Sequence, residues 1–497
     1  LGSKPSAARL FITADSSFRL FVNGAFVHRG PARCAPEDQS YDILDIAGLL
    51  RRGKNVLAVL AHHNGVPTAL HGLGRPGFLC QLEVTAGGKT QIFVSDASWR
   101  VNATKAWSAN SPQQKTSKGG GGGNLSIGAP LPPNPFGRGF IEEVNLSLVD
   151  PTWTAMDFDD SKWVEASVVS HAYGWPTRYD EPGANVRPWI TLVPRDLPYL
   201  KETPVRATGI HSTSEVIEYE KLSSDSDLSM IVAQDIVVPL EFCKVSGTAQ
   251  WKSGRGPLIL HNSDLRDENV IANGIRSVRV ILDIGDGMNG YARLDIEGSK
   301  GAIADITYGP HLVGNQIAVT LQGARNVDRL ILSGGRDVWE AEDWRFFRYM
   351  GITVRDAVEP VRLHWAGMTR IGYPFEEKGR FSSDSSSLDA LWKAGAKTVR
   401  IVTTDAYQDN YREQLQYHQT GYYSTRANWA AFGDPYLQRR LLIQGSQAQA
   451  PSGLMPPAYP GSIPGKTVSS IIESNLFYVC QFHDYLLRSG GFEPARL

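Results

Sequence analysis

The chain has 497 residues, with 50 Lys and Arg against 51 Asp and Glu, a formal net charge of -1. This balance offers no basic surface for nucleic acid or for an anionic membrane, and we predict neither partner. No run of about 18 consecutive apolar residues is present, so we predict no membrane span. At about 150 residues per domain, the length predicts two to four domains.

The first 200 residues are predicted to form a β domain of the jelly-roll type, similar to carbohydrate-binding modules. Leu10–Asp15 and Phe18–Val22 read as strands, and Asn23-Gly24 after the second strand is a strong hairpin signal. The continuous apolar run from Val56 to Ala61 predicts a buried strand. Residues 108–137 are rich in Ser, Pro and Gly, which predicts a flexible loop rather than a phosphate-binding loop.

Residues 205–378 predict a second β domain. Four segments alternate apolar and polar residues between glycines: Val278–Gly285, Gly290–Gly298, Ala302–Gly309 and Arg329–Gly335. Alternation with glycine punctuation is typical of an antiparallel sandwich.

The hydrophobic period changes near residue 380, and residues 380–497 predict helical hairpins. Asp384 is the expected N-cap of a first helix that carries apolar residues from Leu388 to Val402. Further helices are predicted at 420–432, 436–444 and 470–487, with Gly433-Asp434 ending one and capping the next. In the last helix we expect one buried face, formed by Ile472, Leu476, Val479, His483 and Leu486. The predicted fold class is therefore multidomain β plus α.

The densest polar cluster lies between the first two predicted helices, from Asp405 to His418. Asp409 and Glu413 are four residues apart and share a face if this turn is helical. Two carboxylates beside Arg412 can diverge in pKa, as acid–base cleavage of a glycosidic bond requires. Tyr407 and two further tyrosines, Tyr411 and Tyr417, are candidate walls of such a site. An ordinary salt-bridged helix start explains the same spacing.

Several motifs, taken in order, resemble α-L-rhamnosidases of the six-hairpin, (α/α)6-barrel type, glycoside hydrolase family 78. They are Phe18–Gly24 with Leu50–Leu57, Leu282–Gly298, Trp339-Glu340 with Phe346–Met350, Phe381–Asp384 with Leu391-Trp392, and Gly453–Pro460. The resemblance implies two β-sandwich or jelly-roll domains followed by the first part of an (α/α)6 barrel. It also implies release of terminal α-L-rhamnose from plant polysaccharide or glycosides by an inverting mechanism.

The resemblance also assigns roles within the polar cluster. The family has a loop of the form Asp-Cys-Pro-x-Arg-Glu-x-x-Gly-Trp-Thr-Gly-Asp, and Arg412-Glu413-Gln-Leu-Gln-Tyr417 is similar to its middle. Glu413 is thereby the expected general acid, Asp409 and Arg412 are expected to hold ring hydroxyls, and Tyr417 is expected to stack on the sugar. Asn410 stands in place of the Cys-Pro pair, and Thr420 in place of the later Asp, which points to a related specificity.

The barrel is expected to be incomplete in this chain. Twelve helices form such a barrel, and about four are predicted between 381 and 497. The family's general base comes from the second half of the barrel, so no base is assigned here. We expect exposed apolar helix faces and a partner segment, the rest of the same protein, that covers them.

Two other functions stay open at this point. A lyase acting on rhamnosyl-uronate linkages would use a Tyr/His pair such as Tyr417 and His418. A carbohydrate-binding protein without catalysis is the third reading, since the loop differs from the family pattern.

Residues with other chemistry give weaker signals. Cys34 and Cys80 form either a disulfide or two free thiols. His62-His63 and His171 are weak metal candidates, because neighbouring residues of a strand face opposite ways. We therefore predict no metal site and no cofactor, with calcium left open. Sequons at Asn102, Asn124 and Asn145 favour a secreted or extracytoplasmic protein only slightly. The sequence begins at Leu1 without a basic-then-apolar leader, which fits a processed protein and a protein that is never exported equally well.

Overall fold

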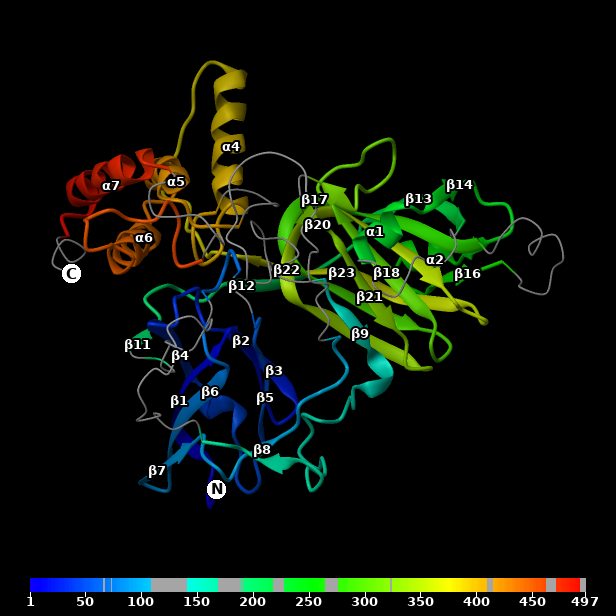
Figure 1. The fold of residues 1–497 in the computed structure, drawn as a ribbon, viewed down its shortest axis with the longest axis horizontal. Coiled ribbons are helices and arrows are strands. Elements are labelled where there is room, and N and C mark those ends of the chain that lie inside the picture. The colour runs from blue at the N-terminus through cyan, green and yellow to red at the C-terminus, as the bar shows by residue number, and fades with distance from the viewer. Residues whose placement is uncertain are drawn as a thin grey trace.

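The fold is described from a computed structural model. It describes residues 1–65, 68–72, 74–108, 141–168, 189, 191–217, 228–263, 276–321, 324–408, 414–461 and 471–491. In Figure 1 the N-terminal β strands, the large β sheet and the C-terminal helices form three bodies around a common junction. The predicted flexible loop at 108–137 lies almost wholly outside the described residues.

The N-terminal body has two facing sheets. One has the strand order β11-β4-β1-β6-β7, and the other has the order β3-β2-β5. Their bounds are β1 Pro5–Asp15, β2 Ser17–Val22, β3 Ala25–Gly30, β4 Asp38–Asp45, β5 Leu57–His62, β6 Gly77–Ala86, β7 Lys89–Val94 and β11 Thr191–Pro194. Alternate residues of β1 and β2, including Leu10, Ile12 and Leu20, fill the core between the sheets. This two-sheet arrangement follows from the period-two pattern of these strands.

The expected hairpin at Asn23-Gly24 is confirmed. Val22 pairs with Ala25, so a two-residue turn joins β2 to β3. Asn23 and Gly24 both have positive φ, 52° and 86°, which this turn requires. The burial predicted for the run from Val56 to Ala61 is wrong. Strand β5 forms there, but only Ala58 in it is buried, because an open groove lies over this part of the sheet.

The second body is a sheet of eleven strands among the described residues. Its main path is β15-β16-β23-β17-β22-β18-β21-β9, and β12, β13 and β14 pair at its side. Its bounds are β9 Glu143–Asn145, β12 Lys201–Arg206, β13 Gly209–Ile217, β14 Ile236–Val238, β15 Lys244–Ser246, β16 Leu258–His261, β17 Arg276–Glu297, β18 Ile303–Gly309, β21 Val327–Ile331, β22 Arg336–Arg355 and β23 Val361–Gly372. Two segments that the sequence separates, Val278–Gly285 and Gly290–Gly298, lie almost entirely within the single long strand β17.

This sheet is antiparallel except where β9 pairs in parallel with β21. Strand β9 lies inside the range predicted for the first domain, yet it extends the sheet of the second. The domain boundary predicted near residue 200 is not tested by this pairing and stays a prediction. Short elements complete the β bodies: β8 Arg100–Val101 with β10 Val164–Glu165, β19 Thr320–Leu321 with β20 Ala324–Arg325, the 3-10 turns η1 Ala47–Leu49 and η2 Leu146–Leu148, and the helices α1 Leu228–Ala233 and α2 Thr248–Lys252.

The C-terminal body contains the four predicted helices. They are α4 Ser386–Ile401, α5 His418–Ala431, α6 Tyr436–Gln447 and α7 Glu473–Ser489. The expected break between α5 and α6 is confirmed: Gly433 has φ +60°, and Asp434 Oδ1 accepts hydrogen bonds from the N–H groups of Tyr436 and Leu437. No described helix is both long and apolar enough to cross a membrane.

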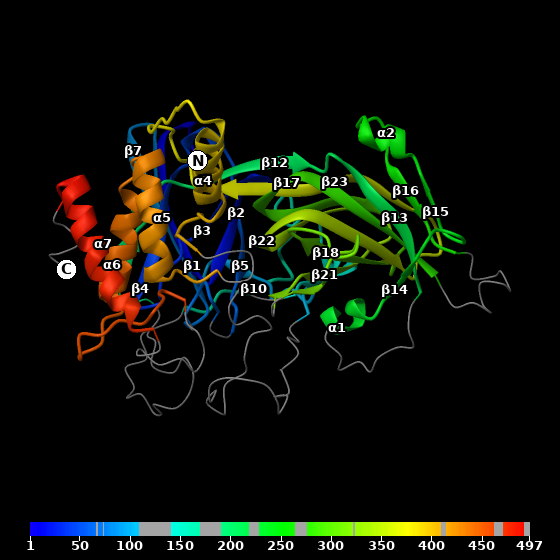
Figure 2. The same cartoon turned by 90° about the horizontal axis from the view of Figure 1, so that it is seen from above.

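Two local predictions about these helices are wrong. Ser385 rather than Asp384 is the N-cap residue of α4. On α7, the face predicted to be buried is exposed: Leu476 and Val479 are 67% and 66% exposed, while Tyr478 and Gln481 on another face are buried. Figure 2 shows α4 to α7 gathered at one end of the molecule, with α7 outermost.

Candidate active site

The segment between α4 and α5 is anchored at both ends. At the start, Thr403 Oγ1 donates to the carbonyl of Val399 at 2.6 Å, and Gln408 N–H donates to the carbonyl of Val402 at 3.0 Å. At the end, Tyr417 pairs with Ala458 across an isolated β-bridge. The described flanks of the predicted polar cluster are therefore held by hydrogen bonds to backbone carbonyls and by a β-bridge.

Arg33, in the turn after β3, reaches across from the N-terminal body and binds this segment. Its Nη1 donates to the carbonyl of Gln414 at 2.6 Å, and its Nη2 donates to Gln408 Oε1 at 3.2 Å. Gln408 and Gln414 are the residues on either side of 409–413, which lie outside the described residues. One buried guanidinium thus ties the two flanks of the stretch that contains Glu413.

Asp405 is the ionic partner of Arg33. Its Oδ2 accepts a hydrogen bond from the Arg33 backbone N–H at 2.5 Å, and its Oδ1 lies 3.7 Å from Arg33 Nε. Burial alone would raise the pKa of Asp405, but the charge and the backbone N–H of Arg33 outweigh it, and the pKa is lowered. The carboxylate therefore stays ionised and fixes Arg33 in place.

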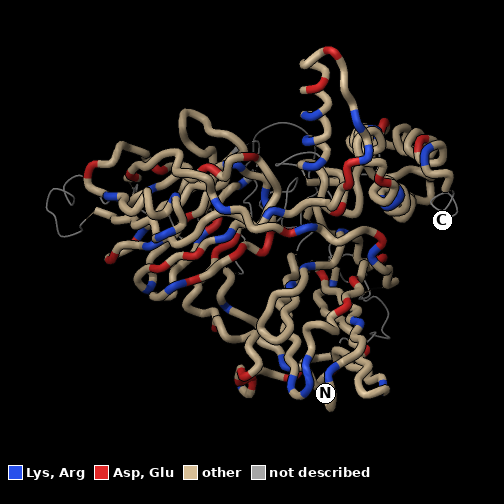
Figure 3. The backbone as a smooth tube through the Cα atoms, turned by 180° about the vertical axis from the view of Figure 1, so that it is seen from behind, with Lys and Arg blue, Asp and Glu red and all other residues tan. Residues whose placement is uncertain are grey.

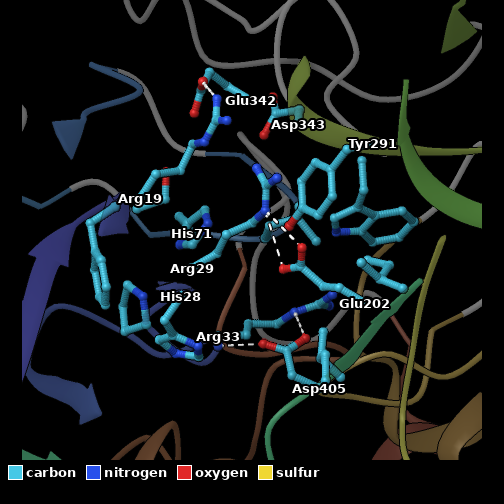
Figure 4. Close-up of a pocket in the computed structure, with 18 of the residues that line it drawn as sticks. Arg19, His28, Arg29, Arg33, His71, Glu202, Tyr291, Glu342, Asp343 and Asp405 are labelled. Atoms are coloured by element: carbon cyan, nitrogen blue, oxygen red, sulfur yellow. Dashed lines mark hydrogen bonds and ion pairs between the residues drawn. The ribbon is translucent and has the colours of Figure 1, made fainter. Parts of the chain in front are cut away.

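Arg33 and Asp405 also form one end of a cavity at the junction of the three bodies, shown in Figure 4. Its volume is about 120 Å³, close to an engineered cavity of about 150 Å³ that holds a six-membered ring. The lining includes Phe18, Arg19, His28, Arg29, Arg33, His71, Arg195, Glu202, Tyr291, Glu342, Asp343, Trp344 and Asp405. Charged groups and aromatic rings thus meet around a small cavity.

Arg29 lies at the centre of this cavity. Its Nε donates to Glu202 at 3.2 Å, its Nη2 binds Glu340, and its guanidinium stacks 3.9 Å from the ring centre of Tyr291. Burial raises the pKa of Glu202 even though the charge of Arg29 opposes the shift. Paired charges of this kind offer hydrogen-bond donors and acceptors whose charges balance. Such a lining binds the hydroxyl groups of a neutral ligand better than it binds an ion.

The structure describes only some of the predicted site residues. Glu413, Asp409 and Arg412 lie outside the described residues. Tyr407 is buried in the core, 1% exposed, and its hydroxyl accepts a hydrogen bond from Asn428 Nδ2 at 2.8 Å. It packs with other apolar residues, so its placement does not support the expectation that it contacts sugar.

Tyr417 and His418 lie at the start of α5. Tyr417 is partly buried and packs against Leu415, Ala458 and Ala69. The His418 ring is fully buried against Tyr478, and burial lowers its pKa to about 4. The imidazole is thus neutral at pH 7, and neither ring nitrogen has a hydrogen-bond partner in the described part of the chain.

Sequence reasoning missed Arg33 and the cavity. Arg33 and Asp405 are 372 residues apart, and neither position stands out in its local pattern. Asp405 belongs to the predicted polar cluster, but its spacing does not pair it with a second carboxylate as that of Asp409 and Glu413 does. The cavity forms only where the N-terminal body packs against the large sheet and against the segment after α4.

The remaining candidates have plain structural roles. All four cysteines are free thiols, so the disulfide alternative for Cys34 and Cys80 is wrong. His63 Nδ1 lies 3.3 Å from Asp15 Oδ1, and His171 lies outside the described residues. Among the described residues, no group of three or more His, Cys, Asp or Glu is arranged to hold a metal ion.

Comparison with known proteins identifies both β bodies. Residues 3–111 match the α-L-rhamnosidase N-terminal domain, and residues 274–368 match the bacterial α-L-rhamnosidase concanavalin-like domain. A search of curated proteins gives no match.

Solved structures of rhamnosidases share the fold. The chain superposes on the glycoside hydrolase family 78 rhamnosidase of Bacillus sp. GL1 with a TM-score of 0.75 and 21% identity, over 99% of this chain and 65% of that one. For the α-L-rhamnosidase of Aspergillus terreus the values are 0.62, 16%, 100% and 48%, and for that of Dictyoglomus thermophilum 0.59, 16%, 99% and 47%. The chain spans about two thirds or less of the length of these proteins. Two successive domains of the α-L-rhamnosidase family are therefore present in this chain, within the fold of the family 78 enzymes.

Proposed function

We propose that this chain is part of a glycoside hydrolase that releases terminal α-L-rhamnose from plant polysaccharides or glycosides. The observation that carries the proposal is the position of Arg33, whose guanidinium holds the two flanks of the segment containing Glu413 beside a ring-sized polar cavity. The two rhamnosidase domains and the rhamnosidase neighbours support the choice of sugar. A neighbour from Streptomyces avermitilis has been solved in complex with L-rhamnose.

In the proposed mechanism Glu413 protonates the leaving oxygen, and Asp409 and Arg412 hold hydroxyls of the rhamnose ring. Tyr417 supplies an aromatic face at the end of the same segment. The mechanism inverts the anomeric configuration, so a second carboxylate activates a water on the opposite face of the ring. We assign that base to a segment of the protein beyond these helices.

The helices are, in this proposal, the first part of an (α/α)6 barrel. The support is the exposure of apolar side chains on the two outermost helices, α4 and α7. Leu391 of α4 is 69% exposed, and Leu476 and Leu487 of α7 are 67% and 73% exposed. Apolar rows of this kind are rare on a finished surface and mark places where other elements pack. The partner segment would cover both rows. The proposed location of the protein is extracytoplasmic, where such substrates occur.

The test compares two leaving groups in the full-length protein. Glu413→Gln removes the acid but keeps the size of the side chain. Release of rhamnose from gum arabic, whose leaving alcohol needs a proton, should fall about 10²–10⁴-fold. Release from p-nitrophenyl α-L-rhamnoside should fall much less, because nitrophenolate leaves without protonation. Glu376→Gln, at an exposed side chain near α4, is the matched control and should behave as the wild type.

Equal losses on both substrates would show that Glu413 is not the acid, and normal turnover on gum arabic would end the proposal. NMR of the first product formed should show the β anomer, as inversion requires. The lyase alternative makes a different prediction, since its unsaturated product absorbs in the near ultraviolet. Absorbance that rises with rhamnose release would replace the hydrolase proposal.

A further inference from the structure

A second hollow in the molecule lies on the N-terminal body, away from the candidate active site. It is a groove of about 600 Å³ over strands β5 and β6, within the range of about 300–1,000 Å³ typical of ligand sites. Its lining includes Val56, Val59, Cys80, Leu82, Phe93, Trp99, Arg100, Trp153, Phe158, Asp160, Trp163 and Lys54. It shares no lining residue with the cavity at the junction.

Three tryptophans border the groove, and the same local structure presents each of them. Before each indole, an aspartate accepts hydrogen bonds from a Ser or Thr two residues later. The pairs are Asp96 with Ser98 at 2.9 Å, Asp150 with Thr152 at 2.8 Å and Asp159 with Ser161 at 3.0 Å, measured to the backbone nitrogen. A turn then closes at each tryptophan. The backbone N–H of Trp99, Trp153 and Trp163 donates to the carbonyl of Asp96, Asp150 and Asp160, respectively. Turns of this kind fix loop residues at low entropic cost.

The three indoles differ in what they already contact. Trp99 is structural, because its Nε1 donates to the carbonyl of Val94 and its ring packs on Phe78. Trp153 and Trp163 contact Phe21 and Phe158 edge-to-face, at 5.3 and 5.4 Å. Neither of these two indole N–H groups donates to any described residue, and both rings are only partly buried. Two partly exposed indoles, whose N–H groups have no acceptor among the described residues, therefore border an open groove.

The chemistry of the groove selects its ligand. The faces of a pyranose ring carry C–H groups that stack on indoles, and its edge carries hydroxyls that need donors and acceptors. The rim carries two exposed cationic side chains, Lys54 and Arg100, and one exposed carboxylate, Asp160. Arg100 lies 3.7 Å from Glu165, and neither Lys54 nor Asp160 forms an ion pair within the described part of the chain. Charges of both signs disfavour a strongly acidic ligand and disfavour a lipid. The geometry points to a carbohydrate-binding site that takes one or two neutral pyranose rings of a polysaccharide.

The experiment is native electrophoresis of the full protein in gels containing galactan, xyloglucan or glucomannan. These are neutral polymers without rhamnose, so a rhamnose site does not contribute. At least one polymer should retard the wild type. Trp153→Ala and Trp163→Ala should each weaken the apparent affinity about tenfold, and Trp153→Phe, which keeps an aromatic face, should lose less. Trp365→Ala is the matched control, because Trp365 is a partly buried tryptophan of the other sheet, stacked on Arg293.

Circular dichroism would show whether each variant is folded. If an alanine variant unfolds, Lys54→Met and Asp160→Asn test the rim with exposed residues and should weaken binding severalfold. The inference is overturned if none of the three polymers retards the wild type. It is equally overturned if the folded tryptophan variants are retarded as strongly as the wild type. Glu413→Gln should leave retardation unchanged, so the outcome is independent of the proposed catalysis.

Discussion

The large β sheet and the helical body differ in their buried polar groups and in the apolar side chains that they leave exposed. In the sheet, an apolar core that includes Val280, Leu294 and Ile352 is surrounded by charges that are paired with one another. In the helices, amide side chains such as Gln438 and Gln481 are fully buried, while leucines of α4 and α7 are exposed. Figure 3 shows the charged residues spread along the strands of the sheet.

The difference shows which body satisfies its own side chains. A sheet whose apolar residues are inside and whose buried charges are paired has satisfied its own side chains. The helices bury amide side chains beside small apolar clusters and leave leucines of α4 and α7 exposed, as the proposed further layer of helices would require. Their buried amides bond to backbone, as when Gln481 Nε2 donates to the carbonyl of His418 at 2.7 Å. The helical body is therefore the part of the molecule whose stability depends most on what it contacts.

The largest effect is expected from breaking a paired charge in the sheet. Asp305 is fully buried and accepts hydrogen bonds from Arg329 and Arg355 at 2.6 Å each. Asp305→Asn removes the carboxylate that Arg329 and Arg355 share, which leaves Arg355 with Asp235 alone, and should lower the free energy of unfolding by about 3–5 kcal/mol. Urea denaturation followed by circular dichroism measures the loss.

The control for Asp305 is Asp295, which has the same two-pronged bond. Arg336 Nε and Nη2 donate to Asp295 at 2.7 Å each, but Arg336 is 57% exposed. Asp295→Asn should therefore cost less than about 1 kcal/mol. Similar losses in the two variants would show that burial of the pair does not matter, and the contrast between the bodies would weaken.

Prediction from sequence worked where local signals decide. The turn at Asn23-Gly24 and the break at Gly433-Asp434 depend on residues that favour left-handed backbone or cap a helix, and both were predicted. The buried face of α7 was predicted wrongly, since periodicity shows that Leu476 and Val479 share a face but not whether anything covers it. No local sequence signal predicts the contacts of Arg33, because its partners Asp405, Gln408 and Gln414 lie in the helical body.

A second prediction concerns the neutral histidine among the buried polar groups of the helices. Burial lowers the pKa of His418 to about 4 in the folded chain, against about 6.5 unfolded. The unfolded state therefore binds more protons between these values. Stability from this residue is fully present above pH 6.5 and is lost as the pH falls toward 4, by about 3 kcal/mol in total.

His418→Gln removes the titrating group. The free energy of unfolding, measured by urea denaturation from pH 7.5 to 4, should fall less steeply in this variant than in the wild type. His483→Gln, at an exposed histidine of α7, should keep the wild-type slope. Parallel curves for the wild type and His418→Gln would show that the ring is protonated in the folded state and that the helices bury a charge there.

The smallest change in the free energy of unfolding is expected from a substitution on the exposed face of α7. This substitution gives the most direct test of the contrast between the sheet and the helical body. Leu476→Ser changes a side chain that is 67% exposed and should alter the free energy of unfolding of this chain by less than about 0.5 kcal/mol. Leu442→Ala, in the buried cluster between α6 and α7, should cost about 2–5 kcal/mol. In a protein that also contains the proposed partner segment, Leu476→Ser should become costly by about 1.5–3 kcal/mol, because the leucine would then be buried. If Leu476→Ser changes the free energy of unfolding of that longer protein as little as it changes that of this chain, the exposed row on α7 is an ordinary surface. The proposal that a further segment packs on the helical body then fails.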